Sequence, residues 1–257
     1  HVEPEATDWS IRLRLDGVLH PAARLPRRLA PTLVARLKVL ADLPTYVNDV
    51  PQDGRIPRAR AGAATDLRLA VLPTVHGEKA VVRLFESRVE ARTLGSLGLP
   101  ADAGLALERA VLAPQGVVVL SGPAGSGKST TIHAALQLVL ERSQGARSVV
   151  GIEDPVERVV PGVTQCQVNP GAGFGYAEAL RAFLRQDPEV IYVGEARDAT
   201  TAGVVIEAGL TGHLVITTLH AGSCAQVLTR LLEMRLEPHL ISSALAVTFA
   251  QRLVRRV

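Results

Sequence analysis

The sequence predicts an α/β protein in two parts, and its style changes near residue 100. The first part has short alternating apolar and polar runs around one helical segment, which is typical of a small α+β module. Beyond it, apolar strands alternate with amphipathic helices, which favours a mostly parallel sheet with helical crossovers. At 257 residues the chain is long enough for one or two domains with a sizeable core.

The first module is predicted from three stretches. "WSIRLRLDGVLH" alternates apolar and charged residues and turns at Asp16-Gly17, which indicates a hairpin. The runs "DLRLAVLP" and "AVVRLF" indicate two further strands joined around Gly77. Between these hairpins, "RRLAPTLVARLKVLAD" predicts a helix whose apolar face is formed by Leu29, Leu33, Leu37 and Leu40, with Val34 beside them.

The second part contains four strand candidates, "GVVVLS", "SVVGIE", "EVIYVGE" and "HLVITTLH". Apolar residues at helical spacing separate them, first at Ile132, Leu136, Val139 and Leu140 and then at Tyr176, Leu180, Phe183 and Leu184. We expect the sheet of this domain to be mostly parallel, with helical crossovers.

Composition excludes several classes of protein. The net charge is +3, but the arginines are interleaved with 25 acids, so we expect a solvated surface and no nucleic-acid partner. Cys166 and Cys224 lie far apart without metal-ligand spacing, so no zinc site is expected within this stretch, and a reducing compartment is favoured. No run approaches 18 apolar residues, which predicts no membrane span. Because the chain starts at His1, we expect it to be part of a longer protein.

"GPAGSGKST" has the spacing of a phosphate-binding P-loop, between a short apolar strand and an amphipathic helix. Glycines let backbone N–H groups turn toward a phosphate, and the following helix N-terminus adds partial positive charge. Lys128 can reach the β- and γ-phosphates, and Ser129 offers a hydroxyl to Mg²⁺. The alternative, a glycine-rich turn without a ligand, does not account for the lysine and hydroxyl together. The predicted nucleotide-binding residues are Gly122, Pro123, Ala124, Gly125, Ser126, Gly127, Lys128, Ser129 and Thr130.

Three downstream strands end in acids or histidine, at the edge where parallel sheets bind ligands. "GIEDPVE" supplies Glu153 and Glu157, "EVIYVGEARD" supplies Glu195, and "TGHLVITTLH" has His213 and His220 at its two ends. Strand-end acids also cap helices, and Asp198 is expected to cap the helix that follows it.

With these motifs the chain resembles the secretion ATPase superfamily that drives type II secretion and type IV pilus assembly. "GPAGSGKST" resembles its Walker A motif, "IEDPVE" its Asp box, "VIYVGEARD" its Walker B region and "TGHLVITTLH" its His box. "ALRAFLRQDPE", "PQDGRI", "LPTVHGEKAVVRL" and "AQRLVR" are also similar, so the resemblance spans nearly the whole chain.

The resemblance implies two domains: a PAS-like α+β domain over residues 1–92, truncated at its start, and a RecA-like ATPase domain over residues 106–257, truncated at its C-terminus. Residues 93–105 would form the linker.

The resemblance also implies roles for individual residues, with ATP and Mg²⁺ as substrate and cofactor. Lys128 would bind phosphate, and Ser129 and Glu195 would serve Mg²⁺. Glu157 is the first candidate to polarise the attacking water and Glu153 the second, and the sequence does not separate them. Four further residues would sense phosphate or close the domains onto the nucleotide, namely His213, His220, Arg68 and Arg83, although a plain structural role stays open for each of them.

The resemblance further implies a homo-hexamer, peripheral at the cytoplasmic face of the inner membrane. Its partner would be the cytoplasmic domain of a membrane platform protein. Three alternatives stay open: a pilus-retraction or conjugation-type ATPase, a nucleotide-binding scaffold that does not hydrolyse, and a nucleic-acid translocase.

The sequence departs from the family pattern at Ala196, where a larger apolar residue is usual, and in "LPTYVNDVPQDGRI", which lacks the usual basic run. The chain stops just before the region where many assembly-type members carry four cysteines for zinc, and the sequence does not tell whether such a region follows.

Overall fold

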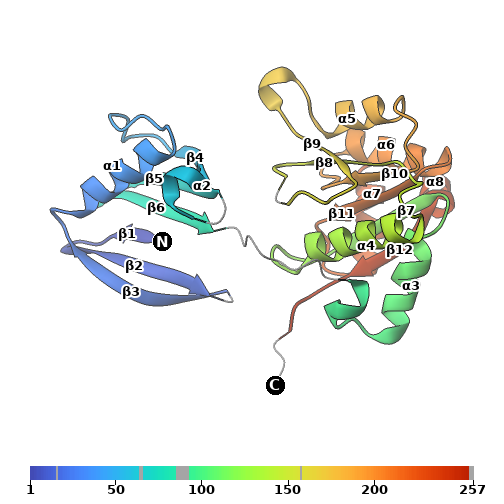
Figure 1. Ribbon diagram of the computed structural model, residues 1–257, viewed down its shortest axis with the longest axis horizontal. Helices are drawn as coiled ribbons and strands as arrows, with labels where there is room; N and C mark the ends of the chain where they lie inside the picture. The colour runs from blue at the N-terminus through green and yellow to red at the C-terminus, as the bar shows by residue number, and fades with distance from the viewer. Residues whose placement is uncertain (16, 64–65, 85–92, 157, 255–257) are drawn as a thin grey trace. The chain divides into compact units, whose positions relative to one another are not determined.

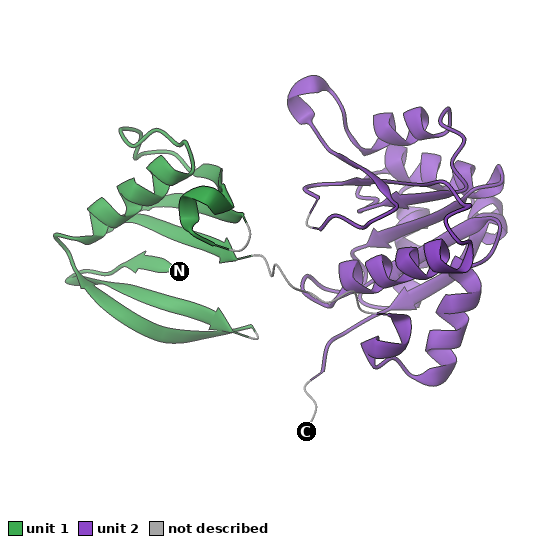
Figure 2. Ribbon diagram, viewed as in Figure 1, with its two compact units in different colours: residues 1–89 green, residues 90–257 purple. Residues whose placement is uncertain are grey.

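The computed structural model describes residues 1–15, 17–63, 66–84, 93–156 and 158–254. The chain divides into two compact units, residues 1–89 and 90–257 (Figure 2). Both units combine a six-stranded sheet with helices (Figure 1).

Unit 1 is an antiparallel sheet in the order β3-β2-β1-β6-β5-β4. Its elements are β1 Val2–Pro4, β2 Asp8–Leu15, β3 Val18–Pro26, α1 Ala30–Leu40, β4 Gln52–Ile56, α2 Arg58–Ala61, β5 Leu67–Thr74 and β6 Gly77–Leu84. Both predicted hairpins are present, because β2 pairs with β3 and β5 pairs with β6. The sequence did not indicate β1 and β4, which are short.

Three leucines of the predicted apolar face of α1, Leu33, Leu37 and Leu40, pack partly buried against the core of unit 1. The buried residues of the helix are Ala30, Val34 and Lys38, whereas Leu29 is 50% exposed. Lys38 is fully buried because its ammonium group has three oxygen partners. These are Glu78 Oε1 at 2.5 Å, the Val47 carbonyl at 2.7 Å and Asn48 Oδ1 at 3.1 Å. No sequence pattern predicted the burial of Lys38.

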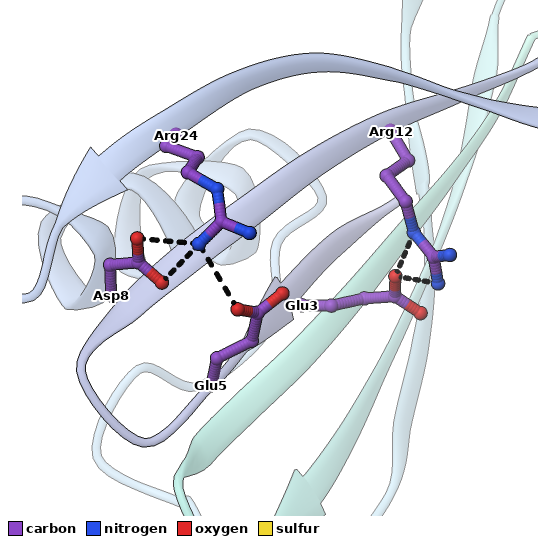
Figure 3. A network of polar contacts seen from close by, with 5 residues as sticks. All are labelled: Glu3, Glu5, Asp8, Arg12 and Arg24. Atoms are coloured by element: carbon purple, nitrogen blue, oxygen red, sulfur yellow. Dashed lines mark hydrogen bonds and ion pairs between the residues drawn. The ribbon is translucent and has the colours of Figure 1, made fainter.

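Ion pairs tie the first three strands of unit 1 together (Figure 3). Glu3 on β1 accepts from Arg12 Nε at 2.6 Å and pairs with Lys79 at 2.6 Å. Burial acts to raise the pKa of Glu3, but hydrogen bonds from Lys79 and Arg12 outweigh it, so the pKa is lowered. Arg24 on β3 donates to both Asp8 oxygens, at 2.7 and 2.9 Å, and to Glu5 at 3.2 Å.

Unit 2 is a parallel sheet in the order β12-β7-β11-β10-β8-β9. Its strands are β7 Gly116–Ser121, β8 Val149–Glu153, β9 Thr164–Gln167, β10 Val190–Val193, β11 Leu214–Leu219 and β12 Leu245–Ala250. Its helices are η1 Leu94–Leu97, α3 Ala101–Val111, α4 Lys128–Arg142, η2 Pro170–Ala172, α5 Tyr176–Phe183, α6 Ala199–Leu210, α7 Cys224–Glu233 and α8 Pro238–Ala244.

Successive residues of β7 enter two different cores, as expected for a strand covered on both faces. Val117 and Val119 pack with residues of α5 to α8, whereas Val118 and Leu120 pack with residues of α3 and α4. The four central strands, β7, β8, β10 and β11, are buried along their whole length, and the predicted parallel sheet with helical crossovers is confirmed. Asp198 also caps α6 as predicted, with Oδ1 accepting from the Thr201 backbone N–H at 2.8 Å.

Residues 93–105, the predicted linker, hold η1 and the start of α3. Leu94 and Leu99 pack against the core that contains α4. The assignment of residues 1–92 to a PAS-like domain stays a prediction. No helix in the described part of the chain has the length and apolar character that a membrane crossing needs.

Candidate functional site

The loop between β7 and α4 has a backbone that requires glycine. Gly122, Gly125 and Gly127 have φ values of 146°, 74° and 85°, which other residues rarely adopt. A Cβ on Gly122 would lie 2.3 Å from the carbonyl oxygen of Gln251. Gly127 is the left-handed N-cap of α4 and has no side chain to satisfy the first backbone N–H groups of the helix. These donors are therefore left for an anion.

Lys128 is the first residue of α4, and its ammonium group lies against this loop. Its Nζ donates to the carbonyl oxygens of Gly122 at 2.8 Å and Pro123 at 3.0 Å. Partial burial lowers its pKa, and the nearby charge of Glu195 opposes that shift. A cation held at the loop by neutral carbonyls can exchange them for phosphate oxygens, which bind it more strongly.

Two hydroxyl groups show that the loop fits a phosphate group and its metal ion. Ser126 Oγ is buried without a hydrogen-bond partner in the described part of the chain. Such a donor is costly unless a ligand or water satisfies it. Ser129, in the first turn of α4, is half-buried and has no side-chain bond to another described residue, so its hydroxyl is free to bind Mg²⁺.

The carboxyl ends of four neighbouring strands meet at this edge. β7, β11, β10 and β8 are consecutive and parallel, and they deliver the P-loop, His220, Glu195 and Glu153, respectively. Neither Glu153 nor Glu195 lies at the opposite end of the sheet, where these four strands begin.

Glu195 is the centre of a polar cluster and is 9% exposed. Its Oε2 accepts from Arg197 Nε at 2.6 Å, and its Oε1 lies 3.1 Å from His220 Nε2. The hydrogen bond to Glu195 raises the pKa of Arg197. The charge of Glu195 also acts to raise the pKa of Lys128, so the same carboxylate influences His220, Arg197 and the lysine of the loop.

Glu153 is 4% exposed and already has protein partners. Its Oε1 accepts from Gln165 Nε2 at 2.6 Å, and its Oε2 lies 3.7 Å from His133 Nε2 on α4. This arrangement suits a residue that holds β8, β9 and α4 together better than one that activates water. Glu157, the other predicted base, lies outside the described residues.

His213 lies at the opposite edge of the sheet from the P-loop. It precedes β11, and its carbonyl oxygen accepts from the Gly116 N–H at 3.0 Å, at the start of β7. The six residues of β7 lie between Gly116 and the P-loop, so this hydrogen bond is about 20 Å along the strand from the loop. Its Nδ1 lies 3.2 Å from the Ala208 carbonyl oxygen. Within this unit His213 therefore does not join the phosphate site, and only His220 of the predicted pair does.

Arg68 and Arg83 belong to unit 1, where they lie directly opposite each other on β5 and β6. Arg55 on β4 is opposite Arg68 in turn. Both predicted arginines are exposed, and no carboxylate in the described part of the chain pairs with either. Like charges in register repel, so this pair is suited to binding an anion.

Sequence reasoning missed two residues at the site. Tyr176, at the start of α5, has its hydroxyl 3.4 Å from the position of a Cβ on Gly194. Burial, followed by the charge of Asp154, raises the pKa of Tyr176 to about 12. Gln251, beyond β12, contacts the P-loop from a position 120 residues away from its partner Thr131. In the sequence, Tyr176 is recognisable only as part of a helix face, and Gln251 only as part of the family-like stretch "AQRLVR", without a role at the P-loop.

Fold and site together define a P-loop protein with a RecA-like parallel sheet. Over residues 1–257 the chain matches the family described as Type II/IV secretion system protein, and it belongs to that family.

Relatives of known identity are similar along the whole chain. It is 46% identical over 258 residues to the Type IV pilus assembly ATPase PilB of Thermus thermophilus, and 44% identical over 255 residues to the Type II secretion system ATPase E of Vibrio cholerae. These alignments cover 100% and 99% of this chain, but only 29% and 50% of the relatives. The solved structure of the pilus retraction motor PilT with bound ADP is 25% identical, with a TM-score of 0.70, and the match covers 98% of this chain and 74% of that one.

Proposed function

We propose that the chain is the catalytic part of an ATP-hydrolysing motor for type II secretion or type IV pilus assembly. The observation that carries the proposal is the convergence of Lys128, Glu195 and His220 on the P-loop edge of the sheet. Relatives that share the whole chain at 44–46% identity are named as ATPases of these two systems.

The chain's own groups suggest how the site would work. Backbone N–H groups of residues 125–128 and the ammonium of Lys128 would bind the β- and γ-phosphates. Ser129 and Glu195 would hold Mg²⁺, which supplies positive charge to the phosphate oxygens. His220, held by Glu195, would lie at the γ-phosphate side.

Glu157 would accept the proton of the attacking water, because Glu153 is buried against Gln165 and His133. Arg68 and Arg83 would approach the phosphates when the two units close. Their mutual repulsion would then be relieved by the anion, so closure would depend on whether ATP or ADP is bound.

Assembly or export is favoured over retraction. The named assembly and secretion relatives are 44–46% identical, compared with 25% for the retraction motor. We further propose a homo-hexamer that acts at the cytoplasmic face of the inner membrane on the cytoplasmic domain of a platform protein.

Phosphate release by the full-length protein tests the activity. We expect turnover by the wild type, loss of nucleotide binding in Lys128→Ala, and retained binding with at least a hundredfold lower kcat in Glu157→Gln. Glu153→Gln should reduce kcat less than Glu157→Gln does. Glu207→Gln, an exposed position on α6, is the matched control and should leave kcat unchanged.

A wild-type hexamer that binds ATP without turnover would support the scaffold alternative instead. Stimulation of turnover by DNA, but not by a platform-protein domain, would support a translocase.

A further inference from the structure

After β12 the chain runs alongside the P-loop. β12 pairs in parallel with β7, with Ala250 opposite Ser121. The backbone N–H of Gln251 then donates to the carbonyl oxygen of Ser121, the last residue of β7, at 2.9 Å, which continues the pairing up to the start of the loop. We call residues 251–253 the strap.

Gln251 contacts the P-loop at both ends. Its carbonyl oxygen lies 2.3 Å from the position of a Cβ on Gly122, and its Nε2 lies 2.9 Å from that on Gly127. Its Oε1 accepts from Thr131 Oγ1 at 2.8 Å, and Thr131 is 1% exposed on α4. The backbone of Gln251 therefore lies against the start of the loop, and its side chain connects the end of the loop with the helix that follows.

The rest of the strap reaches a second part of the site. Arg252 donates to the Gly222 carbonyl oxygen at 3.4 Å, two residues after His220. Gly222 is also held by Gln226, whose Oε1 accepts from the Gly222 N–H at 2.7 Å. Leu253 lies 3.5 Å from the position of a Cβ on Gly127. The strap thus links the loop that binds phosphate to the loop that carries His220.

Three glycines make the P-loop intrinsically flexible, and an ordered loop loses less entropy when a ligand binds. We propose that Gln251 is a positioning residue whose side chain holds the P-loop in its phosphate-binding conformation through Thr131 and Gly127, and that Arg252 fixes the His220 loop to the same strap. This inference rests on the proposed nucleotide-binding function. Gln251 acts through the loop and does not itself contact phosphate.

The test uses the full-length protein with Mg²⁺ and ATP, and a non-hydrolysable ATP analogue for binding. Gln251→Ala should weaken analogue binding and raise KM for ATP about tenfold, equivalent to about 1.4 kcal/mol, with kcat at saturation nearly unchanged. The loop contacts the ground state and the transition state alike, so its disorder affects binding and not the chemical step.

Thr131→Val removes the other half of the same hydrogen bond. It should weaken binding of the analogue by a similar factor. The double variant should bind the analogue no more weakly than the single variant that has the lower affinity. The matched control is Gln144→Gly, which removes an exposed amide beyond the end of α4 at a residue with φ of 52°. It should bind the analogue like the wild type. If Gln251→Ala does not fold, Thr131→Val still tests the contact.

The outcomes separate the two proposals. If the wild type does not bind the analogue, or if Lys128→Ala binds as tightly as the wild type, the proposed function and the strap role both fail. If the wild type binds and Gln251→Ala has unchanged affinity, only the strap role is wrong. A lower melting temperature with unchanged affinity, or additive losses in the double variant, also overturns it, because either result shows a purely structural residue.

Discussion

Replacing either residue of the buried pair Lys38–Glu78 should destabilise unit 1, and replacing Glu78 should do so more than replacing Lys38. Lys38 is fully buried and Glu78 is its only anionic partner in the described part of the chain. In Glu78→Gln the ammonium group would have only neutral oxygen partners, namely the new amide, the Val47 carbonyl and Asn48 Oδ1. Because a buried charge would then lack its counter-charge, we expect the free energy of unfolding of unit 1 to fall by about 3 kcal/mol.

Lys38→Met should cost less, about 1–2 kcal/mol, because Glu78 is 17% exposed and its charge can reach water. Replacing both residues, as Lys38→Met with Glu78→Leu, should cost less than the sum of the two single changes. The exposed pair Arg60–Asp42 in the same unit is the control. Asp42→Asn, at a φ of 54° that asparagine tolerates, should change stability by less than about 1 kcal/mol.

Tryptophan fluorescence measures this unit selectively, because Trp9 is the only tryptophan in the chain and is 2% exposed in the core of unit 1. Denaturant unfolding of the whole chain, followed at Trp9, gives the change in midpoint and in unfolding free energy. A loss below about 1 kcal/mol in Glu78→Gln, equal to that of the Asp42→Asn control, would refute the reasoning, since it would show that the pair is hydrated in solution.

Three other changes have defined outcomes. Burial acts to raise the pKa of Glu3, but its two basic partners lower the pKa below the ordinary glutamate value of 4.5. The stabilisation that Glu3 gives the folded state is therefore present above pH 4.5 and is lost as the pH falls through the lower pKa of the folded state. In Glu3→Gln, the free energy of unfolding measured at Trp9 should therefore fall less steeply with decreasing pH than in the wild type. An identical pH profile of the two proteins would contradict this. Gly122→Ala should abolish binding of the ATP analogue and lower the free energy of unfolding by about 2 kcal/mol. The added Cβ would overlap the Gln251 carbonyl oxygen, and a φ of 146° is strained for alanine. If this variant binds the analogue as tightly as the wild type, the proposed loop geometry is wrong. Asp198→Ala should cost about 1 kcal/mol through the lost cap of α6, measurable by thermal unfolding, whereas an unchanged melting temperature would show that the cap is dispensable.

Local sequence was sufficient wherever a structure depends on neighbouring residues. The P-loop, the hairpin around Gly77 and the Asp198 cap each depend on a few consecutive residues whose backbone preferences are specific. The fold class was also predictable, because strands buried on both faces must be apolar throughout. Glu195 and His220 were found because parallel strands place their carboxyl ends together.

The sequence was not informative where the partners are distant along the chain. Lys38 is buried by Glu78 and a loop carbonyl, and no pattern within α1 distinguishes it from a surface lysine. His213 and His220 have the same residue type at the two ends of one strand, yet the strand direction places only His220 at the P-loop edge.

The sequence by itself determined that this chain has a phosphate-binding loop on a parallel sheet and which family it resembles. The tertiary structure alone decided which acids and histidines meet that loop, that Glu153 is engaged with Gln165 and His133, and that Gln251 lies beneath Gly122. The physical reason is that backbone preferences act over a few residues, whereas burial and hydrogen bonding at the site are set by strand order, which brings Thr131 and Gln251 together across 120 residues.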